Sequence, residues 1–308
     1  MRALSSGLSY CDLNFQGHER IVATVVLDSP GGCVLIDPGP SSTLPTLDRI
    51  LEKAGISTAD VTTIVLTHIH LDHAGSVGTI LRRQPGTRVY VHRAGAPHMV
   101  DPSKLLASAS RLYAERMTEL WGEVAPVPSA ALTALDGGER IDVGGRTLET
   151  LFTPGHASHH LSYYDPASGV AFVGDTAGIK RREGLYELPP TPPPDIDLEL
   201  WRQSLAAINR WGADTLFLTH FGPSQSARAH LAAFGEHLEW IGGLARTALS
   251  KFEGEDDREA WFTSELRRHL RTVMSETDAR EYEVAGRFDL SYRGLARYWK
   301  KRLLAAGA

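Results

Sequence analysis

The stretch that most constrains this chain is Thr67 to Gly75, which reads Thr-His-Ile-His-Leu-Asp-His-Ala-Gly. Three imidazoles and one carboxylate lie within six residues, directly after the β-branched apolar run at 63–66. A buried strand that ends near Thr67 lets His68 and His70 point to one side and places Asp72 and His73 beyond the turn. Neutral imidazole and carboxylate are good ligands for zinc and other first-row metals. The pattern therefore predicts a metal site at the end of this strand.

Three further polar residues follow predicted strands in the same way. His156 comes after Thr-Pro-Gly behind one strand, Asp175 ends the apolar run 170–173, and His220 ends the run 215–218. Each of them alone is ambiguous, since loop histidines and capping aspartates are common. Their shared position behind a buried strand makes all three candidates for the same site.

Apolar runs that alternate with helical patterns predict an α/β layered architecture for most of the chain. The segment 183–197 contains five prolines, a density that forbids a helix or a central strand and predicts a stiff loop. The predicted strands lie at 21–27, 33–36, 63–66, 88–91, within 139–153, in a hairpin at 161–173 and at 215–218, and the predicted helices include single helices at 104–121 and 197–211.

Behind His220 the apolar residues repeat at spacings of three and four, which is typical of helices that pack on a core. We therefore expect two regions. Residues 1–224 form a catalytic α/β domain, and residues 225–308 form a helical extension that packs on it.

Charge and composition exclude several classes of partner. The chain has 37 acidic and 32 basic residues, a formal net charge of -5, which argues against a nucleic-acid footprint. No run approaches the ~18 apolar residues of a membrane helix, and no apolar segment at the start resembles a signal peptide. Two cysteines, Cys11 and Cys33, exclude a disulfide framework. We expect a cytoplasmic protein with a small-molecule substrate; its oligomeric state, a homodimer included, stays open.

The order of these motifs resembles the metallo-β-lactamase superfamily. His-x-His-x-Asp-His at 68–73 is followed by Thr-Pro-Gly-His at 153–156, Gly-Asp at 174–175 and Thr-His at 219–220, so that the resemblance covers roughly residues 18–222. It implies a four-layer αββα sandwich with the metal site at an edge of the two sheets. The helical C-terminal part is similar to the extension of glyoxalase II-like members.

The resemblance also implies a ligand set for two metal ions. His68, His70 and His156 would bind the first ion. Asp72, His73 and His220 would bind the second. Asp175 would bridge both, and Asp37 would support the site from behind. Zinc suits this set, as do iron and manganese, because affinity order alone does not fix the metal.

These expectations lead to a metal-dependent hydrolase. A metal-bridging hydroxide would attack the carbonyl of a thioester, ester or lactone of a small metabolite. Asp72 is the candidate catalytic residue, orienting the nucleophile and transferring its proton. The presence of Asp175 argues against a β-lactamase, since β-lactamases of this superfamily generally lack the bridging aspartate.

Several alternatives stay open on the sequence. A lactonase of the acyl-homoserine lactone type would have a tyrosine where this chain has Gly178, although Tyr186 is a candidate replacement. A persulfide dioxygenase would bind one iron through residues that match His68, His156 and Asp175. A non-catalytic metal-binding protein is the third alternative. Further candidates for substrate contact are His98 and the basic run Lys180, Arg181 and Arg182.

Overall fold

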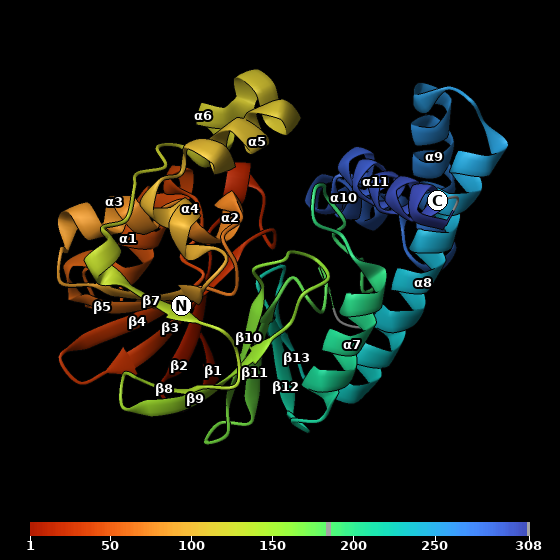
Figure 1. Ribbon diagram of the computed structural model, residues 1–308. Helices are drawn as coiled ribbons and strands as arrows, with labels where there is room; N and C mark the ends of the chain where they lie inside the picture. Colours follow the sequence, from red (N-terminus) through yellow and green to blue (C-terminus); the bar gives the residue numbers. More distant parts are fainter. Residues whose placement is uncertain (183–185, 307–308) are drawn as a thin grey trace.

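Two β-sheets that pack face to face form the centre of the protein (Figure 1). The computed structural model describes residues 1–182 and 186–306. In spatial order, the first sheet contains β1 (Arg2–Ser5), β2 (Leu8–Asp12), β3 (Ala23–Ser29), β4 (Gly32–Ile36), β5 (Val61–Val65), β6 (Arg88–His92) and β7 (Leu132–Leu135). The second sheet contains β13 (Gly222–Ser224), β12 (Thr215–Leu218), β11 (Val170–Gly174), β10 (Leu161–Asp165), β9 (Arg146–Phe152) and β8 (Arg140–Val143).

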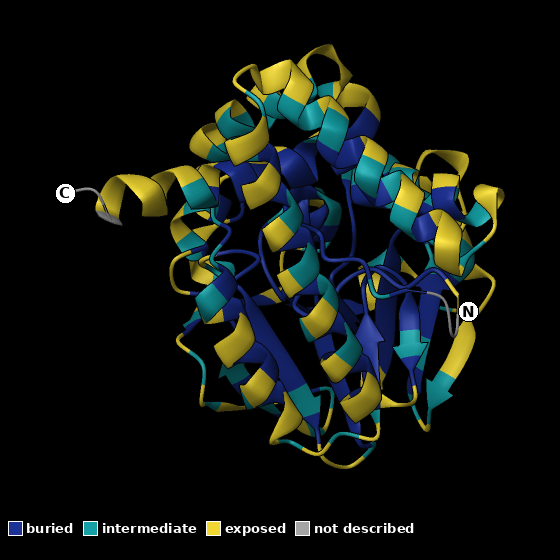
Figure 2. Cartoon of the chain, turned by 90° about the vertical axis from the view of Figure 1, so that its right-hand side faces the viewer, coloured by how far each residue is buried: buried dark blue, intermediate teal, exposed yellow. Residues whose placement is uncertain are grey.

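Helices cover the outer face of each sheet, so the predicted four-layer αββα sandwich is confirmed. The first sheet packs against α1 (Leu44–Glu52) and α3 (Val77–Arg83). The second sheet packs against α7 (Leu198–Asn209) and α8 (Ala227–Lys251). Figure 2 shows the strands buried between these layers and the exposed residues on the outer faces of the helices.

The alternation of side chains along the strands explains the layers. In β11, Val170 and Phe172 point toward the first sheet, whereas Ala171 and Val173 point toward the helices and share a core with Trp201. All five side chains are at most 2% exposed. A fully buried side chain of this size contributes about 1.5–3 kcal/mol through removal of apolar surface from water, which is why a strand buried on both faces is apolar at every position.

Parallel pairing brings the ends of the functional strands to one edge. β4 pairs in parallel with β5, and β11 pairs in parallel with β12. The carboxyl ends of parallel neighbours lie at the same edge of a sheet. The polar residues that follow these four strands therefore lie close together.

One predicted helix is in fact two. Residues 104–121 form α5 (Ser103–Tyr113) and α6 (Met117–Trp121), joined by a 3-10 turn at 114–116 where Ala114 has φ of 45°. The turn folds α6 back, so that the Tyr113 and Trp121 rings meet edge to face at 5.0 Å. No glycine or proline in the sequence signals this break.

The C-terminal region consists of α8, α9 (Glu255–Val273), α10 (Glu276–Gly286) and α11 (Phe288–Ala306). Its apolar residues share one core with α7 and the second sheet, and Phe234, Tyr282 and Tyr292 are fully buried there. The division at 224/225 stays a prediction. Among the helices of residues 1–182 and 186–306, none combines the length and the apolar character that a membrane span requires.

Candidate metal centre

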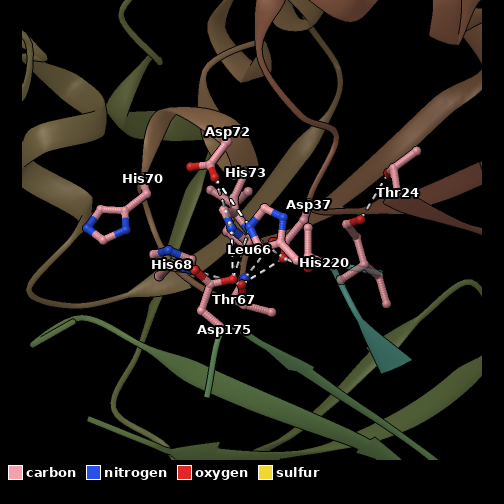
Figure 3. Close-up of polar contacts among 12 residues, drawn as sticks. Thr24, Asp37, Leu66, Thr67, His68, His70, Asp72, His73, Asp175 and His220 are labelled. Carbon is pink, nitrogen blue, oxygen red and sulfur yellow. Dashed lines mark hydrogen bonds and ion pairs between the residues drawn. The ribbon is translucent and has the colours of Figure 1, made fainter. Parts of the chain in front are cut away.

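Four segments deliver the predicted ligands to the shared edge of the sheets, and Figure 3 shows those that follow β5, β11 and β12. His68 and His70 follow β5, and the short helix α2 (Leu71–Ala74) presents Asp72 and His73. His156 follows β9, Asp175 follows β11 and His220 follows β12. The structure thus brings together every residue that the sequence predicts as a ligand.

His68, His70 and His156 form a first group. Their nitrogen atoms lie within 4.8 Å of one another. Nδ1 of His70 is 3.0 Å from Nε2 of His156. Nε2 of His68 is buried and has no hydrogen-bond partner in the part of the chain that the structure describes. Three imidazole nitrogens this close together are typical of a metal site.

Asp72, His73 and His220 form a second group. Oδ2 of Asp72 lies 3.3 Å from Nε2 of His220 and 3.8 Å from Nε2 of His73. Nε2 of His73 is fully buried and has no hydrogen-bond partner among the described residues. This second set therefore offers one carboxylate oxygen and two imidazole nitrogens.

Asp175 lies between the two groups. Its Oδ2 is 3.2 Å from Nε2 of His156, in the first group. Its Oδ1 is 3.2 Å from Nε2 of His73 and 3.3 Å from Nε2 of His220, in the second. One carboxylate that presents a different oxygen to each group has the geometry of a bridging ligand.

The outer ring nitrogens of the histidines are held by acceptors that fix the tautomer. Nδ1 of His156 donates to the carbonyl oxygen of Pro190 at 2.8 Å, and Nδ1 of His220 donates to that of Ile21 at 2.5 Å. A carbonyl oxygen only accepts hydrogen bonds, so Nδ1 carries the proton in both rings. In the neutral imidazole this leaves a lone pair on Nε2, directed into the site.

Asp37 lies behind the candidate ligands and holds their segments in place through hydrogen bonds. Its carboxylate is fully buried and accepts hydrogen bonds from Nδ1 of His73 at 2.9 Å and from the hydroxyl of Thr219 at 2.9 Å. It also accepts from the backbone N–H of Thr67 at 2.8 Å and the Thr67 hydroxyl at 2.7 Å. Since Thr67 and Thr219 precede two ligands, Asp37 ties both strand ends to the ring of His73.

His160 is a supporting residue whose role the sequence does not specify. Its Nε2 accepts a hydrogen bond from the backbone N–H of Asp175 at 3.2 Å, and its Nδ1 lies 3.0 Å from the Thr153 hydroxyl. Gly174, with φ of 48°, allows this approach, because a Cβ there would lie 2.7 Å from Nε2 of His160. His160 thus positions the backbone of Asp175.

The two groups differ in their affinity for protons. Burial lowers the pKa of His68 and His156, and burial with the nearby His156 lowers the pKa of His70 to about 4. In the second group burial opposes protonation of His73 and His220, but the carboxylates of Asp175 and Asp72 raise the pKa of both rings. The imidazoles of the first group therefore favour the neutral form, whereas those of the second group bind a proton more readily.

These observations test whether the residues fit metal ions. The buried Nε2 of His68 has no hydrogen-bond partner among the described residues, and such a nitrogen costs free energy unless something binds it. Nε2 of His73 and Oδ1 of Asp175 form no hydrogen bond of good geometry in the described ranges, and they lie 3.2 Å apart as an ion pair. Five imidazoles and two carboxylates, oriented from behind, match the ligand preferences of zinc and related divalent ions. The donor set fits two such ions.

The site opens into a cavity of about 350 Å³. His98 and His159 line this cavity, as the sequence suggests for His98. Tyr186 does not contact the cavity; it is 2% exposed and its ring stacks on His237 at 3.8 Å. The hypothesis that Tyr186 clamps a substrate is therefore wrong, because the C-terminal helices enclose it.

The basic run after Asp175 has a structural role. Lys180 and Arg181 are buried, and Arg181 donates to the backbone carbonyls of Glu19 and Arg20 at 3.0 Å each. Arg182 pairs with Asp278 at 3.3 Å. None of the three lines the cavity, so a role in binding a substrate carboxylate there is excluded.

A family model described as the metallo-β-lactamase superfamily matches residues 18–220. A metallo-β-lactamase fold-containing protein of Sulfurisphaera tokodaii is 29% identical over 175 residues, covering 56% of this chain and 62% of the relative. A hydroxyacylglutathione hydrolase of Legionella pneumophila is 31% identical over 141 residues, covering 46% of this chain and 41% of the relative. The matches thus span about half the length of these curated relatives.

Solved structures extend the likeness to almost the whole chain. A metallo-β-lactamase family protein from Thermus thermophilus superimposes with a TM-score of 0.71 at 23% identity, covering 97% of this chain and 95% of the other. An archaeal superfamily protein from Sulfolobus tokodaii gives a TM-score of 0.64 at 22% identity, covering 94% and 98%. At this identity the likeness concerns the fold alone.

Proposed function

Because this chain belongs to the metallo-β-lactamase superfamily, we propose that it is a hydrolase with two divalent metal ions, which cleaves a thioester, ester or lactone of a small metabolite. The observation that supports two ions is the second group, Asp72, His73 and His220, joined to the first by Asp175. A dioxygenase with one iron would use His68, His156 and Asp175 and would need no second group.

In this proposal His68, His70 and His156 hold one ion, Asp72, His73 and His220 hold the other, and Asp175 contacts both. Divalent ions in such a site supply Lewis acidity, which lowers the pKa of a coordinated water and polarises a carbonyl. Zinc is our first candidate, with iron and manganese as alternatives.

Asp72 has the properties of a group that orients the attacking water. Its side chain is 26% exposed and lines the cavity, while its Oδ2 faces His220 and His73. Burial opposes ionisation, but the neighbouring His73 and His220 lower the pKa of Asp72 to about 2. So weak a base remains ionised at neutral pH, and its carboxylate would orient a water molecule in the cavity by accepting a hydrogen bond from it.

The names of the relatives favour one class of substrate over others. Several are named hydroxyacylglutathione hydrolases, which favours hydrolysis at an acyl carbon. A lactonase of the acyl-homoserine lactone type is disfavoured at Gly178, where φ is 85° and a Cβ would lie 2.4 Å from the ring of Phe234. A tyrosine side chain at this position would enter the core between the sheet and α8. The tyrosine that contacts the substrate in those lactonases therefore cannot be accommodated here.

The proposal is tested by metal content and turnover measured on the same samples. We expect about two equivalents of divalent metal per chain by mass spectrometry, and turnover on a panel of thioesters, esters and lactones. Asp175→Ala should lower the metal content and abolish turnover together, since it removes an oxygen from each group. Asp195→Ala is the matched control, because this cavity carboxylate accepts a hydrogen bond from the Ser158 hydroxyl at 2.6 Å and belongs to neither group of candidate ligands; it should keep both equivalents. Full activity in Asp175→Ala would refute the two-metal proposal.

A further inference from the structure

The cavity above the metal centre is built from parts of the chain that are far apart in the sequence. Its inner end is formed by candidate ligands, among them His70, Asp72 and His220. Its walls come from α5, from the proline-rich loop at 190–195 and from the junction of α10 and α11 at 285–290. In Figure 1, α5 and α6 stand above the first sheet, and α10 and α11 lie beside the second. The C-terminal helices α10 and α11 therefore form part of the wall of this cavity.

The wall from α5 is mostly apolar. Leu105, Ala109, Leu112 and Tyr113 line the cavity at the spacing of one helical face, and Lys104 and Ser108 line it beside them. An amphipathic helix normally buries such a face against the core. In α5 no residue is fully buried. Its apolar face packs in part against the cluster of Leu71, Leu120 and Trp121, and the rest of that face looks into the cavity.

The opposite wall is largely apolar. Leu290, which is 2% exposed, and the rings of Pro192 and Pro193 line it, together with the carboxylate of Asp195. Arg287 also lines the cavity; its guanidinium lies 5.8 Å from the Tyr113 ring centre and is held by two hydrogen bonds to Asp289, at 3.1 and 2.8 Å. The charge of Arg287 is thereby paired.

We propose that this cavity binds an apolar group of the substrate, so that the enzyme acts on amphipathic esters or thioesters with an alkyl or aryl group of several carbons next to the scissile carbonyl. This inference rests on the proposed hydrolytic function for its chemistry. An apolar face left open to water costs free energy, and the continuity of this space with the metal centre makes the substrate the group that covers it. A volume of about 350 Å³ falls within the range of small-molecule sites.

Binding of inert apolar probes tests the cavity without any need for turnover. We would titrate the protein as purified with straight-chain 1-alkanols from butanol to decanol by calorimetry. The affinity should rise about fourfold per methylene group until the cavity is filled, with a negative heat-capacity change. Affinity independent of chain length would overturn the inference, whatever the enzyme hydrolyses.

A matched pair of variants on α5 places the binding in this cavity. Ala109 lines the cavity, whereas Ala107, two residues away, is exposed and does not. Ala109→Phe fills the space and should weaken decanol binding about tenfold, the loss of one or two methylene contacts. Ala107→Phe adds the same side chain to the outer surface and should leave binding unchanged. Equal effects of the two substitutions would refute the assignment.

Kinetics on acyl chains then link the cavity to the reaction. With a constant leaving group, kcat/KM should rise with acyl length in the parent protein, and Ala109→Phe should shift the optimum to shorter chains. If length in the leaving group, and not in the acyl group, sets kcat/KM, the placement of the apolar group next to the carbonyl is wrong. If alkanols bind as expected but no ester or thioester is cleaved, the hydrolytic function fails, and the amphipathic-substrate inference that rests on it is overturned.

Discussion

Asp37→Asn is the substitution that most sharply tests how the site is held. Asn keeps the shape of the side chain but replaces one acceptor oxygen with an NH2 donor. Oδ1 of Asp37 accepts from the backbone N–H of Thr67, and Oδ2 accepts from His73 and from the hydroxyls of Thr67 and Thr219. Both oxygens of a fully buried carboxylate are therefore in use.

Either orientation of the new amide is unfavourable. If the NH2 group replaces Oδ1, it meets the backbone N–H of Thr67 at 2.8 Å, and a buried donor loses its acceptor, which costs about 1–3 kcal/mol. If it replaces Oδ2, it donates to Nδ1 of His73, so the ring proton moves to Nε2 and the lone pair for the second metal is lost. Loss of such an outer contact lowers metal affinity about 10–100-fold.

The assay is competition with a chromophoric chelator, which reports the affinity of each metal equivalent separately. Asp37→Asn should retain the first equivalent and bind the second about 10–100-fold more weakly. The control is Asp165→Asn, since Asp165 is also fully buried and accepts from Arg146 and Ser168, at 2.7 Å each. This control should lose stability and keep both metals. Unchanged affinity for both equivalents together with unchanged stability in urea unfolding would mean that the hydrogen bonds of Asp37 do not hold the site, because each orientation of the amide affects one of the two quantities.

Two further predictions concern packing. Gly294→Ala should destabilise the protein by about 1–3 kcal/mol in urea unfolding and raise KM, because its Cβ would lie 2.0 Å from the carbonyl oxygen of Thr191 in the proline-rich loop. The control Gly243→Ala, with nothing within 4 Å of its Cβ, should stabilise α8 by up to about 1 kcal/mol; similar effects of the two would contradict the close approach. Cys11 and Cys33 should not react with a thiol reagent at pH 8 until the protein is unfolded, since burial raises the pKa of their thiols to about 11 and about 12. Rapid labelling of the native protein would show that these thiols are accessible.

The positions of the candidate ligands were predictable from the sequence because they follow from local rules. An apolar run predicts a buried strand, and a polar residue directly behind it, such as His68 or His220, must lie at a sheet edge. The hydrogen bonds of His160 had no such signal. Its neighbour His159 has the same type of side chain, and only the fold places His160 against the backbone of Asp175.

The substrate cavity could not be predicted because a helical repeat of apolar residues has two explanations. Leu105, Ala109 and Leu112 repeat along α5 much as Leu231, Phe234 and Leu238 repeat along α8. The residues of α8 are buried in the core, whereas those of α5 line the cavity. A periodic apolar face indicates only that something other than water must cover it. Whether the cover is protein or substrate depends on where α10 and α11 lie, and their positions are set by contacts between residues far apart in the chain.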